Sequence, residues 1–242
     1  MTDVTTEALT HETDGPVAIL TIDDGKANVY THAVLQALHR ALDDIEADPS
    51  VKAVVIAGRP GQFSGGFDLK EFAKGLEQTR DLVVAGGELC NRLLVYPRTT
   101  VTAVTGYAVA AGAILTLACD WNVGTTGPAK MGLPETAIGM ALPRFAIELA
   151  RARLTKTAFT RATLFAEMDP PPEALAAGYL DELAAPDQVV TRAVARAHEL
   201  SALSAGSVAL TKHKARAELH DLIASTIFDD VSSMTTGLAG AG

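Results

Sequence analysis

Residues 106–120, GYAVAAGAILTLACD, carry almost no side-chain bulk at the point where a buried strand leads into a helix. Residues 63–72, FSGGFDLKEF, contain a similar glycine-rich turn. The first N–H groups of a helix have no partner within the helix, and together with the helix dipole they favour negative charge. Two such turns that face one another place two N–H groups around one carbonyl oxygen. That arrangement is an oxyanion hole, and it needs small residues so that a substrate can reach the backbone.

Close packing of helices on strands is a structural explanation for the same small residues. Glycine is common in strand-to-helix turns, so either turn alone favours this explanation. The occurrence of both turns in one chain shifts the balance toward an oxyanion hole. In the first turn, Asp68 is a suitable helix cap with Glu71 three residues later. In the second turn, the helix is predicted to begin near Ala111.

Strands and helices of an α/β fold must position these turns. A strand that is apolar throughout, such as VKAVVIAG, is expected to be covered on both faces. The pattern beyond Ala129 is helical, and GLAGAG at the C-terminus is predicted to be a loose tail. The predicted elements are strands at 15–22, 51–58 and 99–105, helices from about Thr31 to Asp48 and over 80–95, and a helical C-terminal piece over 187–233.

Composition limits the class of partner. The 242 residues are 48% hydrophobic, which is ample for a core, and a formal charge of −9 argues against a nucleic-acid partner. Threonine and glycine interrupt the apolar stretch over 101–119, so we expect no membrane insertion. Cys90 and Cys119 are expected to be buried thiols. Without a leader pattern at its start, the chain is expected to be cytoplasmic, and we predict no metal site.

Three motifs, FSGGFDLKEF, GYAVAAGAILTLACD and GLPETAIGM, resemble the crotonase family of enoyl-CoA hydratases and isomerases in their order and separation. The resemblance covers essentially the whole chain. It implies a crotonase-like spiral of repeated ββα units, with the acyl-CoA site in a core over residues 1–185 and a helical oligomerisation region over residues 186–242. It also implies a homo-trimer or hexamer, and no cofactor beyond the coenzyme A of the substrate.

Matching the motifs assigns the catalytic positions. The resemblance implies that the backbone N–H groups of Phe67 and Ala111 hold the thioester oxygen. Hydratases of the family use two glutamates; here Ile114 occupies the place of the first and Glu135 that of the second. One carboxylate can move a proton from the α carbon to the γ carbon, so double-bond isomerisation is favoured. A weak hydratase and a non-catalytic acyl-CoA-binding protein are the alternatives.

The local sequence around Glu135 permits two interpretations. A glutamate directly after Pro134 complements the dipole of a helix, which is a structural role. The apolar neighbours Leu133, Ile138 and Met140 are expected to raise its pKa, which suits proton transfer. The resemblance favours the second interpretation.

Other polar residues are weaker candidates. Asp68 is expected to cap a helix, Asp120 to lie in a turn, and Glu88 to be at the surface or at the pocket rim. Ser64 lies near the first turn, but a serine peptidase of this fold needs a serine on the helix after the second turn. This chain has only alanine, glycine and isoleucine there, so we discount that class.

The predicted substrate contacts lie around the two turns, the early DGKANV segment and the GLPETAIGM motif. They are Lys26, Asn28, Val29, Gly65, Gly66, Asp68, Lys70, Ala110, Gly112, Ile114 and Met140. The basic groups predicted for the CoA phosphates are Lys26, Arg59 and Lys70, with Lys212 and Lys214 added from the C-terminal helix of the same or of a neighbouring subunit. Whether Tyr107, Met131 or Met140 shapes the acyl pocket is left open.

Overall fold

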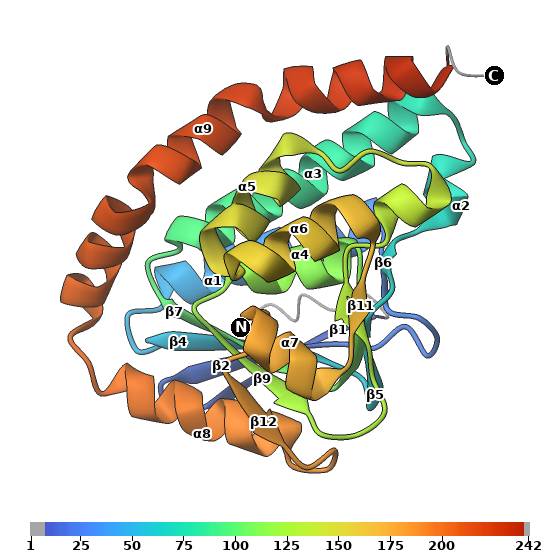
Figure 1. The fold of residues 1–242 in the computed structure, drawn as a ribbon. Helices are drawn as coiled ribbons and strands as arrows, with labels where there is room; N and C mark the ends of the chain where they lie inside the picture. The colour runs from blue at the N-terminus through green and yellow to red at the C-terminus, as the bar shows by residue number, and fades with distance from the viewer. Residues whose placement is uncertain (1–7, 240–242) are drawn as a thin grey trace.

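The strands form a large sheet, a small sheet and one separate pair in the computed structural model, which describes residues 8–239 (Figure 1). The large sheet has the order β1 (Leu9–Asp14), β2 (Val17–Ile22), β4 (Ala53–Gly58), β7 (Thr99–Val104), β9 (Trp121–Thr125) and β12 (Glu182–Ala184). The small sheet has the order β11 (Met168–Asp169), β10 (Met131–Gly132), β8 (Gly106–Val109) and β5 (Gly61–Ser64), and the separate pair is β3 (Val29–Tyr30) with β6 (Gly66–Phe67). Among these strand pairs, β1–β2 and β10–β11 are antiparallel and the others are parallel.

Helices cover both faces of the large sheet. Figure 1 shows α8 below the sheet and α1, α3 and α4 above it. In chain order the helices are α1 (His32–Ala47), α2 (Leu69–Phe72), α3 (Leu76–Val95), α4 (Ala111–Ala118), the 3₁₀ helix η1 (Glu135–Ile138), α5 (Arg144–Arg153), α6 (Lys156–Phe165), α7 (Pro171–Ala177), α8 (Val189–Ser201) and α9 (Ala205–Ala239).

Strand β4 explains why the large sheet is encoded by continuous apolar runs. All of its residues are buried. Ala53, Val55 and Ala57 belong to a cluster with α8, whereas Val54 and Ile56 belong to the main core on the opposite face. The prediction that this strand is covered on both faces is therefore confirmed.

The two glycine-rich turns belong to repeated strand-strand-helix units. These are β4-β5-α2, which has the additional two-residue strand β6 before its helix, and β7-β8-α4. The residues GYAV at 106–109, interpreted from sequence as part of a turn, form strand β8, which pairs in parallel with β5 and β10. Each turn is therefore shorter than predicted and lies between a short strand and a helix. This repeat is the ββα arrangement that the resemblance implies.

Several strands were not predicted. β1 has polar side chains on its exposed face, and β10, β11 and β12 are too short to show a period of two, so the prediction of a purely helical pattern beyond Ala129 is wrong. Residues 237–239 continue α9 rather than forming a loose tail. The remainder of that tail and the first seven residues, on which the leader prediction partly rests, lie outside the described residues.

Helix α9 is tied to the body of the protein by a buried ion pair. The Lys212 ammonium donates to the Asp120 carboxylate at 2.6 Å and to the Arg98 carbonyl at 2.8 Å. Arg216 donates to the same carboxylate at 2.8 Å, which also accepts the Thr100 N–H at 2.8 Å. Asp120, expected only in a turn, therefore anchors the C-terminal helix. Assembly into trimers or hexamers stays a prediction.

Both cysteines are buried and free, as predicted. Burial raises the pKa of the Cys119 thiol to about 12, so this group is not a nucleophile at neutral pH. Within residues 8–239, no helix combines the length and the hydrophobicity that crossing a membrane requires.

Candidate active site

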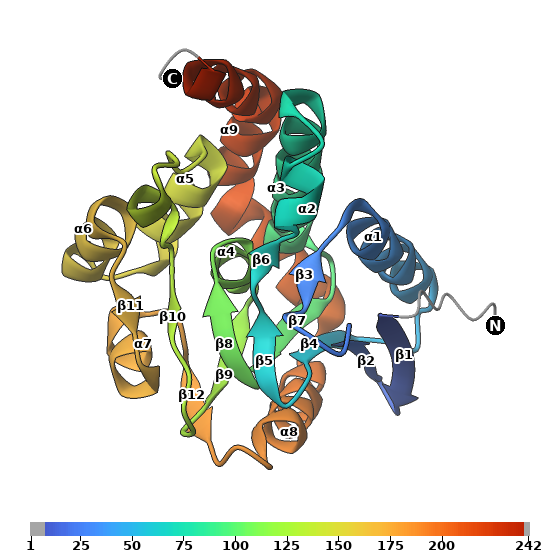
Figure 2. The same cartoon turned by 90° about the vertical axis from the view of Figure 1, so that its right-hand side faces the viewer.

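Three parallel strands of the small sheet end at one edge, and the predicted site residues follow them directly. Figure 2 shows β5, β8 and β10 side by side, and their pairing is parallel. After β5 come Gly66 and Phe67, after β8 come Ala110 and Ala111, and after β10 comes Glu135. Because the carboxyl ends of parallel strands meet at the same edge, the fold brings the three motifs together there.

The two turns touch at residues with positive φ. Gly66 has φ +91° and Ala110 has φ +53°, and each stands immediately before a predicted amide donor. A Cβ built on Gly66 would lie 3.0 Å from the Ala110 Cβ and 3.4 Å from the Ala111 nitrogen. A non-glycine residue at positive φ costs of order 1–2 kcal/mol, and such strain is concentrated at functional sites. The strained backbone of Ala110 therefore marks this junction as more than a packing contact.

The hydrogen bonds around the turns are consistent with donors at Phe67 and Ala111. The Asp68 N–H donates to the Tyr30 carbonyl at 3.1 Å, so the N–H of Phe67, one residue earlier on the strand, points to the opposite side. The Ala110 N–H donates to the Gly132 carbonyl at 3.0 Å, and the helical ladder of α4 begins with Ile114 donating to Ala110. The N–H of Ala111 precedes that ladder. Their role as an oxyanion hole stays a prediction.

Ser64 is a structural residue of the first turn. Its buried hydroxyl donates to the Asn28 carbonyl at 2.7 Å and accepts the Gly66 N–H at 3.1 Å. The hydroxyl proton is therefore committed to a backbone oxygen, which argues against a serine nucleophile at this position. At the second turn, a Cβ on Gly112 would lie 2.7 Å from the Ser64 Cβ, so this glycine allows α4 to approach β5 closely.

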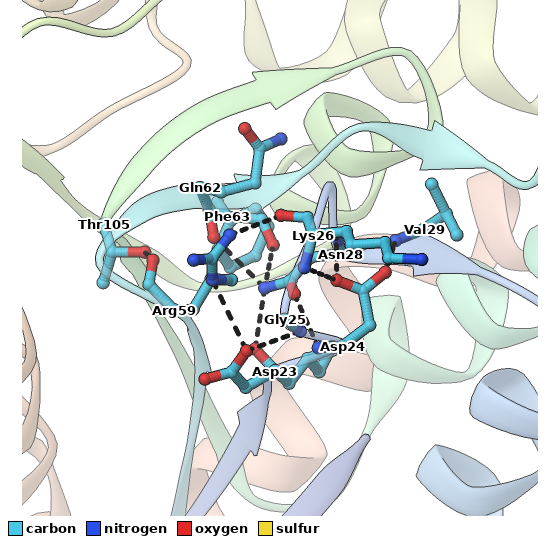
Figure 3. A network of polar contacts seen from close by, with 11 residues as sticks. Asp23, Asp24, Gly25, Lys26, Asn28, Val29, Arg59, Gln62, Phe63 and Thr105 are labelled. Carbon is cyan, nitrogen blue, oxygen red and sulfur yellow. Dashed lines mark hydrogen bonds and ion pairs between the residues drawn. The ribbon is translucent and has the colours of Figure 1, made fainter. Parts of the chain in front are cut away.

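The DGKANV loop docks against β5, the strand that leads into the first turn, as Figure 3 shows. The Asn28 amide nitrogen donates to the carbonyls of Ile22 at 2.7 Å and of Phe63 at 3.3 Å, and its oxygen accepts the Asp24 N–H at 3.0 Å. The Asn28 side chain is fully buried. The side chain therefore holds the loop against β5, and the prediction that Asn28 contacts substrate stays a prediction for its backbone alone. The Ala27 carbonyl adds a bond from the Gly65 N–H at 2.8 Å.

Two charged residues stabilise this loop. Asp24 belongs to the loop and accepts hydrogen bonds from its N–H groups, and Arg59, which follows β4, donates to a loop carbonyl. Burial raises the pKa of the Asp24 carboxyl, but N–H donors from Asn28, Lys26 and Val29 outweigh that effect and lower it overall. The Arg59 guanidinium donates to the Lys26 carbonyl at 2.6 Å (Figure 3). These contacts fix the backbone of Lys26 and Val29, and Val29 pairs with Gly66 of the first turn. Asp followed by Gly and Asn predicted a turn in this segment, but the part of the Asp24 carboxylate in holding the loop was not predicted.

The basic residues divide into exposed and buried groups. Lys26 and Lys70 are exposed beside the first turn, and Asp68 caps α2 by accepting the Lys70 N–H at 2.9 Å. Lys212 is 7% exposed and paired with Asp120, so the prediction that it binds CoA phosphates is wrong. Burial lowers its pKa, and the neighbouring carboxylate opposes that shift. Lys214 is exposed on α9.

Glu135 has the environment of a proton-transfer group. It is 8% exposed, and its Oε2 has no hydrogen-bond partner among the described residues. Burial raises the pKa of its carboxyl from 4.5 to about 7, as predicted. Leu133 is fully buried and Met140 half-buried, but Ile138 is 64% exposed, so its predicted part in this burial is wrong.

An apolar cavity lies directly inside the two predicted donors. It has room for about 10 Å³, which is at the lower limit of what one ordered water requires. Its lining consists of Tyr30, Leu35, Phe67, Gly86, Leu89, Cys90, Ala111, Ile114, Leu115 and Phe145. Ile114 thus faces the inner side of the site, where the resemblance places the first glutamate of a hydratase.

Three residues whose part in the pocket the sequence did not decide, Glu88, Tyr107 and Met131, do not line this cavity. Glu88 is exposed and lines a groove between α3 and α9 together with Arg92 and His220, so it is not brought to the amides. Tyr107 is 40% exposed on β8, and Met131 is buried opposite Ala108 in the pairing of β10 with β8.

The raised pKa of Glu135 predicts a pH-dependent cost in stability. Below about pH 4.5 both folded and unfolded chains hold this proton, and between 4.5 and about 7 only the folded chain holds it, so stability falls as pH rises through that window. The full cost, about 3 kcal/mol, is present above pH 7. Glu135→Gln removes it, so urea unfolding should show the variant gaining stability over wild type between about pH 4 and pH 8. A difference that does not change with pH would contradict the raised pKa.

Known proteins resemble this chain over most of its length. The family model for enoyl-CoA hydratase/isomerase matches residues 12–234. A Thermus thermophilus protein named as an enoyl-CoA hydratase is 36% identical over 203 residues, which is 82% of this chain and 79% of that protein. The crystal structure of an enoyl-CoA hydratase/isomerase family protein from Pseudomonas syringae has a TM-score of 0.91 and 38% identity, covering 94% of this chain and 98% of the other. The apo structure of an enoyl-CoA isomerase from Mycobacterium tuberculosis has a TM-score of 0.88 and 38% identity, covering 93% and 98%. The chain therefore belongs to the enoyl-CoA hydratase/isomerase family.

Proposed function

We propose that this protein is an enoyl-CoA isomerase that moves the double bond of a β,γ-unsaturated thioester into conjugation. The Glu135 carboxylate takes a proton from the α carbon, and the electron pair moves into a dienolate. The dienolate oxygen accepts hydrogen bonds from the N–H groups of Phe67 and Ala111. The Glu135 carboxyl group then returns the proton to the γ carbon, which leaves the double bond between the α and β carbons and the enzyme unchanged.

A single buried carboxyl group carries this proposal. Glu135 has a pKa near neutral, which suits a group that must both accept and return a proton. Ile114 supplies no second acid, and the cavity that it lines offers at most the space of one water. The Mycobacterium tuberculosis protein is named an isomerase with one of its structures and a hydratase with another, and the Thermus protein is named a hydratase. Hydration is therefore the competing activity.

The test is to mix the protein with 3-hexenoyl-CoA and follow the absorbance of the conjugated thioester. Rising absorbance supports isomerisation, and kcat/KM should increase with pH through an inflection near 7 as the free base ionises. Tight binding without an absorbance change would indicate a non-catalytic acyl-CoA-binding protein. Loss of the absorbance of crotonyl-CoA at a faster rate than isomerisation would indicate a hydratase.

Ile114→Glu is expected to raise the hydration of crotonyl-CoA by about a hundredfold, because it adds the acid-base group that water addition requires. The carboxylate enters an apolar site, so the variant should also lose several kcal/mol of stability. Crotonyl-CoA absorbance measures the hydration, and circular dichroism verifies folding. Ile114→Gln is the matched control, since it has the same shape without proton transfer. A folded Ile114→Glu variant with an unchanged hydration rate would contradict the assignment of this position.

Lys26→Glu and Lys70→Glu are expected to weaken CoA binding, and to do so more at low salt than at high salt. Both ammonium groups are exposed beside the first turn, where salt screens their attraction to phosphate. Calorimetric titration with CoA at two ionic strengths measures the effect. Lys156→Glu, an exposed lysine of α6, is the control. Equal losses at both ionic strengths would point to a folding defect and against phosphate contacts.

A further inference from the structure

Two adjacent glycines interrupt the interior of α3, where glycine is a poorer helix former than alanine. A Cβ on Gly86 would lie 2.4 Å from Cζ and 2.5 Å from Cε1 of Phe67. The tip of the Phe67 ring therefore packs directly against the backbone of α3 at Gly86.

The neighbouring glycine has a different explanation. A Cβ on Gly87 would lie 2.3 Å from Cδ1 of Ile227 on α9 and 3.0 Å from the Phe145 ring on α5. Close packing of α9 and α5 thus accounts for Gly87. The contact with Phe67 is what accounts for Gly86, since the three nearest atoms to its added Cβ all belong to that ring.

The Phe67 ring occupies space that continues from the two amide donors. Phe67, Ala111 and Ile114 line the apolar cavity together with Gly86, and about 10 Å³ of room is left in it. The Phe67 ring also lies 6.0 Å from the Phe72 ring of α2, centroid to centroid. An acyl chain that extends inward from a thioester held at Phe67 and Ala111 therefore meets this ring within a few carbons.

We propose that the Phe67 side chain, packed against Gly86, closes the acyl-binding space and restricts the protein to short-chain acyl thioesters. This inference rests on the proposed acyl-CoA site. Phe67 then has two functions in one residue, because its backbone N–H contributes to the predicted oxyanion hole while its side chain determines chain length. Replacing the ring leaves the N–H in place, so the two functions can be separated.

The test measures calorimetric binding of saturated butyryl-, hexanoyl- and decanoyl-CoA, which bind without reacting. Wild type should bind the two short thioesters and bind decanoyl-CoA at least about tenfold more weakly. Phe67→Ala should tighten decanoyl-CoA binding by about tenfold or more, because two further buried methylenes are worth that much. Phe228→Ala removes an exposed ring on α9 and should leave the chain-length profile unchanged.

A double-mutant cycle tests the contact with Gly86 separately. Gly86→Ala should lower the melting temperature of wild type, because the new methyl group overlaps the ring, and raise it in the Phe67→Ala background, where alanine is simply the better helix former. Equal effects in both backgrounds would overturn the contact. Equal affinity of wild type for all three thioesters would overturn the chain-length proposal while leaving the acyl-CoA site intact. Absence of binding to any of them would overturn the proposed function as well.

Discussion

Glu135→Gln is expected to lower isomerase turnover by about a thousandfold while the affinity for acyl-CoA changes by less than about threefold. The amide keeps the size of the carboxyl group in this buried position, but it neither accepts nor returns the proton. Among the described residues, Glu135 is the buried carboxylate in the segments that directly follow β5, β8 and β10. Absorbance at saturating 3-hexenoyl-CoA measures turnover, and calorimetry with butyryl-CoA measures binding.

Glu88→Gln is the matched control for this prediction. Glu88 is exposed and faces the groove between α3 and α9, so its replacement should leave turnover near wild type. Residual activity above about a tenth of wild type in Glu135→Gln would rule out a mechanism with one base. A parallel loss of binding and turnover would instead indicate that the carboxyl group holds the substrate.

Gly66→Ala should reduce kcat by about a hundredfold to a thousandfold, the range that follows loss of an oxyanion donor. Its new methyl group would lie 3.0 Å from the Ala110 Cβ and 3.1 Å from the Val109 carbonyl oxygen, and its φ of +91° disfavours a side chain. The two turns must therefore separate, which moves the N–H groups of Phe67 and Ala111 apart. Steady-state kinetics with 3-hexenoyl-CoA provide the measurement.

Gly61→Ala separates backbone strain from displacement of the donors. Gly61 also has a positive φ, +79°, but nothing lies within 4 Å of its added Cβ. Both variants should lose about 1 kcal/mol or more of stability, and only Gly66→Ala should lose turnover. Similar kinetic losses in the two variants would mean that the junction of the turns has no special part in the reaction.

Local chemistry allowed much of the fold to be predicted from one sequence. Thr31 caps α1 and Asp68 caps α2, and α4 begins at Ala111, as predicted, because these signals lie within a few residues of the structures that they control. Residues 106–109, which form strand β8, were predicted to be part of a turn, because GYAV is too short and its side chains too small to show the alternation of a strand. The identity of β8 as a strand depends on pairing with β5 and β10, which are distant in sequence.

Contacts between segments that are distant in sequence explain why several features of the candidate site were not predicted. The Asn28 side chain donates to carbonyls of β2 and β5, and the Lys212 ammonium pairs with Asp120. Neither interaction could be predicted from the residues adjacent in sequence. The positive φ of Ala110 was equally invisible, since alanine rarely adopts it. The raised pKa of Glu135 was predictable because apolar residues lie close to it in sequence, and one of them, Leu133, is fully buried. The contact of Gly86 with the Phe67 ring was not predicted, although a pair of glycines inside a helical pattern indicates close packing.

The ion pair that anchors α9 also determines when the protein can finish folding. Arg216 lies 96 positions after Asp120. At ordinary rates of translation, Arg216 is therefore synthesised about 5 to 20 s after Asp120, and the ion pair cannot form before then. During that interval the Asp120 carboxylate has the N–H and hydroxyl of Thr100 as its partners. A protease or a premature stop codon that removes α9 therefore does more than delete a peripheral helix, because it leaves the carboxylate that joins β7 to β9 without its two cations.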